Sequence, residues 1–208
     1  MIDHTTLITY ILIVLGFVFI PGPATLLTMA RAASSGTRVG IATGAGIAAG
    51  DVVHTTMAIV GLSAIIATSA LLFSVVKYAG AGFLIYLGIR AMLDKTPIEV
   101  NGGAPAISAA RAFRQAVLTE VLNPKTALFF LAFLPQFVPP EHGSTTLQLA
   151  LLGAVFVLLG LLSTVVFAVG AGRLGNLLRR HPAVVKWQGK VVGTIYCAVG
   201  VRLALQER

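Results

Sequence analysis

Two charged side chains stand inside otherwise apolar stretches of this chain. Asp51 closes the run GIATGAGIAAGD, and His54 follows three residues later, on the same face of the helix that the run predicts. Lys125 follows Asn123 and Pro124 in the run LNPKTALFF. A charge in the middle of a bilayer costs about 3 kcal/mol or more. A carboxylate and an ammonium at such positions therefore indicate acceptance of a proton or of a charged substrate.

The same residue types also serve other chemistries. Asp51 and His54 together suggest a metal ligand pair, but two ligands are too few, so no metal is expected. An enzyme acting within the membrane would need paired carboxylates or a nucleophile with its base, and neither is evident, so no catalytic residue is predicted. Glu120 is interpreted as a charge at the membrane interface. A structural pair of Asp51 with Lys125 stays open as the plainest alternative.

Proline interrupts the apolar runs at two places. Pro21 and Pro23 flank Gly22 in FVFIPGPATLL, and Pro124 interrupts the later run. Each proline lacks an N–H and disfavours helical geometry in the residue before it. An unpaired carbonyl in lipid costs several kcal/mol, so the breaks must be compensated or useful. We expect each break to open a half-helix whose N–H groups bind a carboxylate, while the freed carbonyls accept from an ammonium.

Composition indicates which elements must position these residues. Of 208 residues, 57% are hydrophobic and 11% are charged, where a soluble domain carries about 25% charged residues. The apolar runs are continuous rather than alternating, which disfavours a β-barrel. The sequence therefore predicts an all-α integral membrane protein with six transmembrane helices. The expected spans are 7–27, 39–62, 70–92, 115–137, 147–170 and 188–205.

The basic residues indicate an orientation. They cluster in the first, third and fifth connections, whereas the fourth connection, PPEHGS, carries only Glu141 and His142. The positive-inside rule places the basic connections in the cytoplasm and both termini outside it. The net charge of +8 is thereby explained without a nucleic-acid partner.

The two halves of the chain repeat each other weakly. PATLL at 23–27 matches PKTAL at 124–128, and KYAG at 77–80 matches KWQG at 186–189. We predict one transporter domain over 1–208, with halves of about 1–93 and 112–208 and a linker of about 94–111. Three spans in each half make the second repeat inverted, and corresponding broken helices indicate a transport site between the repeats.

In combination these motifs resemble the lysine exporter (LysE/RhtB) family of bacterial amino-acid exporters. The resemblance runs through PGPATLL, SGTRVGIATGAGIAAGDVVH, AGAGFLIYLGIRAM and LNPKTALFFLAFLPQFV. It implies an inner-membrane amino-acid exporter driven by the proton motive force, with a proton as coupling ion and no cofactor. The family motifs fall on Pro21, Gly22, Pro23, Gly50, Asp51, Asn123, Pro124 and Lys125. His54 joins these residues as a candidate for the translocation path.

Several alternatives remain open at this point. The cargo could be another small metabolite or a cation, although the spans hold no dense set of acidic or thiol ligands. A membrane scaffold without transport would use the prolines only as kinks. A homodimer also stays open.

Overall fold

The computed structural model describes residues 2–19, 22–68, 70–93, 106–138 and 143–180, together with ten positions between 187 and 205. Every regular element in these ranges is helical. The predicted all-α class is therefore confirmed. Outside the described residues lie Pro21 and the linker positions 94–105. Most of the last predicted span, 188–205, also lies outside them.

The first helical unit is broken where the sequence predicts. Helix α1 covers His4–Phe19 and helix α2 covers Pro23–Ser35, with a bend of 51° between them. Pro23 takes the first helical position of α2, where a missing N–H breaks no helical hydrogen bond. The first predicted span ends at residue 27, but α2 continues to Ser35 and so includes Arg31, in the stretch predicted as the first connection.

A single residue, Gly36, separates α2 from helix α3. Its φ of 92° lies in the left-handed region that glycine adopts without penalty, and its N–H bonds to the Ala32 carbonyl. Helix α3 covers Thr37–Thr68 and helix α4 covers Ala70–Leu93. Asp51 lies near the middle of α3, as predicted.

The second broken unit has the same plan. Helix α5 covers Ala109–Val121 and helix α6 covers Pro124–Leu128, and the two parts of this unit are bent by 45°. A π-helical turn over Phe129–Phe133 and a 3-10 turn over Leu134–Phe137 continue α6. Helix α7 then covers Thr145–Arg180.

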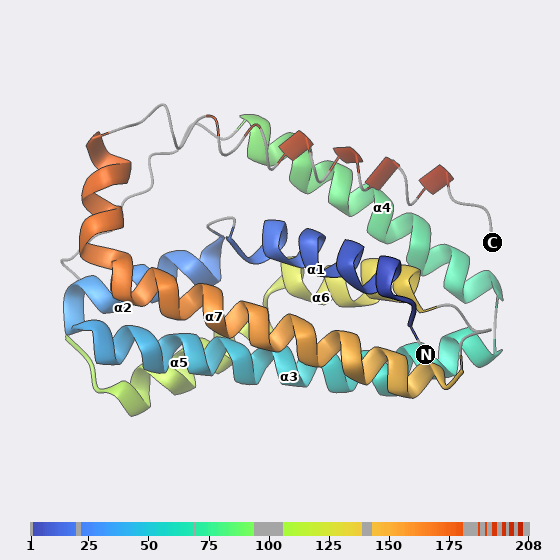
Figure 1. Cartoon of the computed structure of the whole chain (residues 1–208), viewed down its shortest axis with the longest axis horizontal. Helices are drawn as coiled ribbons and strands as arrows, with labels where there is room; N and C mark the ends of the chain where they lie inside the picture. The colour runs from blue at the N-terminus through green and yellow to red at the C-terminus, as the bar shows by residue number, and fades with distance from the viewer. Residues whose placement is uncertain are drawn as a thin grey trace.

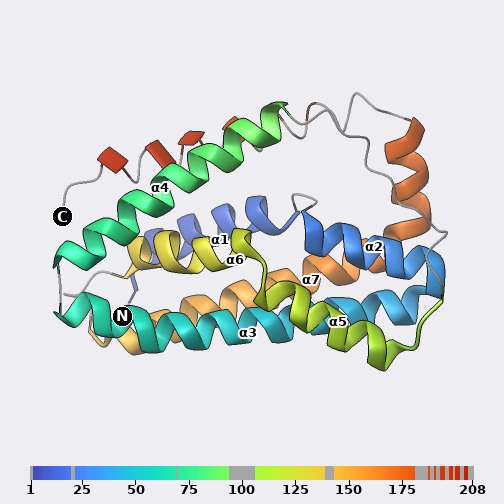
Figure 2. The same ribbon diagram turned by 180° about the vertical axis from the view of Figure 1, so that it is seen from behind.

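The helices gather around α3 and α7, which run side by side along the molecule (Figure 1). Helices α2 and α5 pack against one part of α3, and the reverse view shows α1 beside α6 (Figure 2). Helix α4 lies along the outside and contacts the π-helical turn. The two breaks therefore meet in the middle of the bundle.

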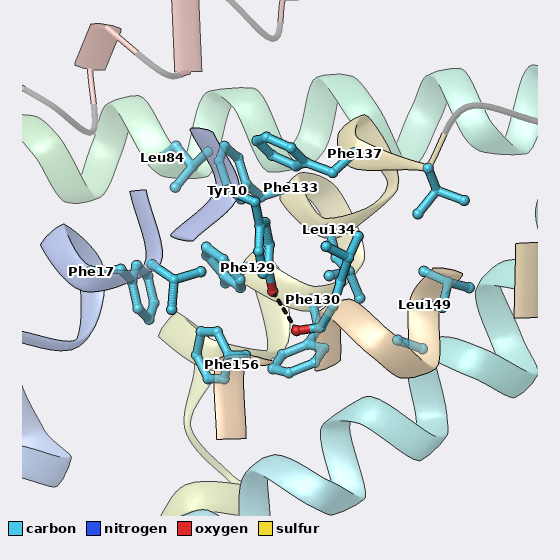
Figure 3. Close-up of a cluster of buried hydrophobic side chains, with 14 of the residues drawn as sticks. Tyr10, Phe17, Leu84, Phe129, Phe130, Phe133, Leu134, Phe137, Leu149 and Phe156 are labelled. Carbon is cyan, nitrogen blue, oxygen red and sulfur yellow. Dashed lines mark hydrogen bonds between the residues drawn. The ribbon is translucent and has the colours of Figure 1, made fainter. Parts of the chain in front are cut away.

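Aromatic side chains form the main core between α1, the π-helical turn and α7 (Figure 3). Phe129 lies at its centre, with ring centroids 4.5 Å from Phe17 and 4.8 Å from Phe156. The buried Tyr10 hydroxyl donates to the Leu152 carbonyl at 3.0 Å. This core fixes α1 against the π-helical turn and α7, and it forms one end of the space between the breaks.

The capacity to cross a membrane can be judged from length and composition. Among the described residues, Thr145–Ala171 is long and apolar enough to span alone, and each bent pair passes when its two helices count as one span. By length and composition, the described residues thus provide one crossing, or up to three if each bent pair is one span. Six spans and an inverted repeat stay predictions.

Candidate functional site

Helix α1 ends in carbonyls that the proline residues leave without a helical partner. In a continuous helix the Phe17 carbonyl would accept from the N–H of residue 21, which is a proline. The Lys125 ammonium donates to this carbonyl at 3.4 Å and lies 4.1 Å from the centre of the Phe17 ring. Ser163 on α7 donates to the next carbonyl, that of Val18, at 2.8 Å. The negative end of the α1 dipole also favours the ammonium.

Helix α2 begins at the same break, and its first residues line the space there. Its capping residue is Gly22, which has no side chain to bond the first N–H groups. Gly22, Pro23, Ala24 and Thr25 all line one cavity. The N-terminus of a helix favours an anion, because its N–H groups and its dipole both present positive charge.

The second break is closed by its own side chains. The Asn123 side-chain oxygen caps α6 by accepting from the Lys125 N–H at 3.0 Å. The Asn123 amide nitrogen donates to both oxygens of Glu120, at 3.1 and 3.2 Å. Thr126 donates to Glu120 Oε1 at 2.5 Å. Glu120, Asn123 and Thr126 thus form one buried cluster.

His54 reaches this second break from α3. Its Nε2 lies 2.9 Å from the Glu120 carbonyl, so Nε2 carries the proton and donates. In a continuous helix that carbonyl would bond to the N–H of residue 124, again a proline. The His54 ring stacks on Phe130 with centroids 5.9 Å apart. The Asn123 N–H also donates to the Glu120 carbonyl, at 2.9 Å. His54 is therefore its second donor, and it is not among the residues that line the cavity.

Gly50 allows α3 and α5 to approach closely at this point. A Cβ atom on Gly50 would lie 2.6 Å from the Glu120 Cβ, closer than side-chain atoms can pack. Gly50, a family-motif position, is therefore a packing residue at this contact. Its position brings Glu120 against the helix that carries Asp51.

Asp51 is 2% exposed and lines the cavity from α3. Gly160 on α7 leaves room for it, since a Cβ there would lie 3.2 Å from Asp51 Oδ2. The Asp51 carbonyl accepts from the Thr55 hydroxyl at 2.8 Å. Within the described part of the chain, no side chain or N–H is seen to donate to its carboxylate, so the cavity is the natural source of a partner.

The cavity between the two breaks has a volume of about 50 Å³, enough for a few water molecules. Its apolar wall includes Phe17 and Phe156 from the aromatic core. Its polar lining comes from both broken units and from α3 and α7: Thr25, Asp51, Glu120, Asn123, Lys125, Thr126 and Thr164.

The structure brings most of the predicted site residues together. Gly22, Pro23, Asp51, Asn123 and Lys125 line the cavity. Gly50 and His54 stand behind it against the second break. Pro124 begins α6 and is exposed, and Pro21 lies outside the described residues.

Glu120 corrects the sequence interpretation. It was expected as an interfacial charge, yet it is 1% exposed and lines the cavity with Asp51. Its burial depends on the approach that Gly50 allows, which the sequence does not show. One signal was present, because Glu120 precedes Asn123 by three residues, one helical turn before the break.

A metal site finds no support in the described ranges, where no group of three or more His, Cys, Asp or Glu residues is close enough to hold an ion. The polar groups instead suit an organic ion with both charges. Positive groups gather at Lys125 and the α2 N-terminus, and acidic groups at Asp51 and Glu120.

Comparison with known proteins finds one matching family model and several relatives that match most of the chain. A family model described as LysE type translocator matches residues 15–207. An uncharacterized membrane protein of Bacillus subtilis is 31% identical, over 96% of this chain and 99% of its own length. One of Vibrio cholerae is 29% identical over 95% of each chain. A homoserine/homoserine lactone efflux protein of Salmonella typhimurium is 30% identical over 88% of each chain. No solved structure matches this chain.

Proposed function

Because the chain belongs to the LysE type translocator family, and is thus a bacterial multi-pass membrane transporter rather than an enzyme, we propose that it exports amino acids from the cell. The observation that carries this proposal is the cavity between the two breaks, whose lining presents both positive and acidic groups. An amino acid is a zwitterion and needs both.

The substrate carboxylate would bind at the first break. Lys125 supplies an ammonium there, and the uncapped start of α2 supplies backbone N–H groups. Both are held in place before the substrate arrives, Lys125 by the Phe17 carbonyl and by the cap that Asn123 gives its backbone. A preformed site lowers the entropic cost of binding.

The substrate ammonium would bind Asp51. A buried carboxylate facing a small cavity can accept a proton or an ammonium, but not both at once. That exclusivity would couple outward movement of the substrate to inward movement of a proton, so the proton motive force would drive export. We place the protein in the inner membrane, with the basic connections in the cytoplasm and both termini outside.

The relatives support export as the direction. The Salmonella proteins of 30% and 29% identity are named homoserine/homoserine lactone efflux proteins. Those names concern an amino acid and its lactone. An amino acid or a close derivative is therefore the cargo that we propose here.

The test is an efflux measurement in cells that overproduce the protein and are loaded with mixed dipeptides. Parent cells should release one or more amino acids against a concentration gradient. Asp51→Asn should accumulate in the membrane normally but fail to concentrate substrate outside, and Asp51→Glu should keep part of the activity. Absence of selective efflux over the whole panel would contradict the proposal and favour a non-transporting scaffold. An Asn variant that concentrates substrate as the parent does would remove Asp51 from the coupling step.

A further inference from the structure

Glu120 is the point on which several motif residues converge. Asn123 and Thr126 bond to its carboxylate, and His54 bonds to its carbonyl. Gly50 allows its close approach to α3. A residue contacted by so much of the site is placed there by the fold, and its carboxylate lines the same cavity as Asp51 and Lys125.

The two acids of the cavity are bonded differently. Glu120 accepts three hydrogen bonds from the second break: two from the Asn123 amide and one from the Thr126 hydroxyl. This is the bonding pattern of an ionised carboxyl group, which only accepts. The Asp51 carboxylate has no such donors among the described residues. Glu120 is thus a fixed charge, whereas Asp51 takes its partner from the cavity.

Among the described residues, the charged lining of the cavity consists of Asp51, Glu120 and Lys125. With all three ionised, the two acids exceed the single ammonium by one negative charge. One acid suffices to bind a substrate ammonium. The second acid therefore acts mainly on other charges that a ligand brings into the cavity. Inside a small cavity a like charge is repelled far more strongly than in water, because the effective dielectric constant is low.

We propose that Glu120 is a specificity-determining residue that makes the cavity reject ligands with a second carboxylate, namely acidic amino acids. This inference rests on the proposed export of amino acids and adds the charge class of the substrate. Neutral and basic amino acids carry one carboxylate, which Lys125 and the start of α2 receive. Glutamate and aspartate bring a second, which Glu120 repels.

A purely structural role for Glu120 predicts a different outcome. If it only closes the second break, replacing it would lower transport of all substrates by the same factor. The ratio between acidic and neutral substrates separates the two roles. Glutamate against glutamine and aspartate against asparagine are matched pairs, because the members of each pair have nearly the same size and differ in charge.

The experiment uses the full chain reconstituted in lipid vesicles. Export of a neutral amino acid that the parent transports is measured in competition with each matched pair. In the parent, glutamine and asparagine should compete and their acidic partners should not. In Glu120→Gln, the preference for the uncharged partner should fall by about tenfold or more, which corresponds to about 1.4 kcal/mol. Glu120→Asp keeps the charge and should keep the preference.

The experiment also has a control variant for the change in charge, and the following results would overturn the proposal. Asp3→Asn makes the same change of charge at an exposed position outside the cavity and should leave the preference unchanged. A preference in Glu120→Gln equal to that of the parent would overturn the proposal. If Glu120→Gln does not accumulate in the membrane, the parent protein alone tests the proposal. In the parent, glutamate that competes as well as glutamine would overturn the proposal. A parent that exports no amino acid at all would overturn the proposed function, and this inference with it.

Discussion

At the break between α1 and α2, the carbonyls of Phe17 and Val18 bond to side chains that come from α6 and α7. At the break between α5 and α6, most of the bonding groups belong to the break itself, and His54 is the contribution from another helix. The first break is therefore completed by distant parts of the chain. The second is built locally.

This difference indicates separate roles for the two breaks. A locally closed break keeps its shape when neighbouring helices move, so Asn123 and Glu120 form a fixed support for Lys125. A break whose carbonyls bond to side chains of other helices changes its hydrogen bonds when those helices shift. We therefore expect changes at the first break to act mainly on transport and changes at the second to act mainly on stability.

The largest effect is expected for Lys125→Met, because this side chain joins the two breaks. The variant loses the ammonium at the Phe17 carbonyl and the proposed partner of the substrate carboxylate. Truncating one partner of a buried charge pair costs about 2–5 kcal/mol, so export should fall by about 30-fold or more. Lys77→Met is the matched control, since Lys77 lies over the Tyr78 ring on α4 and does not line the cavity. Equal losses in both variants would contradict a special role for Lys125.

Asn123→Ala should mainly destabilise the protein. It removes the cap of α6, worth about 1–2 kcal/mol, and leaves the buried Glu120 with fewer donors. Thermal unfolding in detergent should show a lower midpoint than in the parent, and less protein should accumulate. If the unfolding midpoint of Asn123→Ala equals that of the parent while export is lost, the prediction is wrong. The second break would then act on transport in the same way as the first.

Replacing the two prolines should distinguish an effect on folding from an effect on transport. Both Pro23 and Pro124 occupy the first position of a helix, where proline is tolerated, so replacing them with alanine should change stability by less than about 1 kcal/mol. Pro23→Ala should lower export severalfold with normal abundance, because an added N–H favours a continuous helix through the open break. Abundance that falls together with export would identify the prolines as packing kinks.

The smallest effect is expected for Ser163→Ala. Its hydroxyl is the donor to the Val18 carbonyl, and losing one such bond in a buried place costs about 1 kcal/mol. Thermal unfolding should show a small decrease, and export should change less than in Lys125→Met. A loss of export as large as that of Lys125→Met would place Ser163 in the site itself.

Much of this arrangement follows from local signals in the sequence. A missing N–H is a property of proline alone, so both breaks could be located without any tertiary contact. Asp51 and Lys125 were found because a charge in an apolar run has a cost that needs a reason. Their meeting in one cavity was expected from the repeat and is seen in the structure.

The remainder depends on contacts between helices. Glu120 was assigned to the interface from its distance along the chain, but the approach of α3 at Gly50 buries it. The length of α2 was underestimated because Arg31 indicated a loop, whereas helical geometry continues up to the left-handed Gly36. Neither property is encoded in a local pattern.

The one-residue turn at Gly36 joins α2 and α3 as a closely packed helical hairpin. That hairpin carries the N–H groups at the start of α2 and also Asp51, one group for each end of a zwitterion. The opposing piece, α5 with α6, carries the other positive group, Lys125, and the second acid, Glu120. Because α3 and α5 pack tightly at Gly50, these two helix pairs meet along one side of the cavity. A zwitterion bound there would therefore contact both pairs and add a bridge between them.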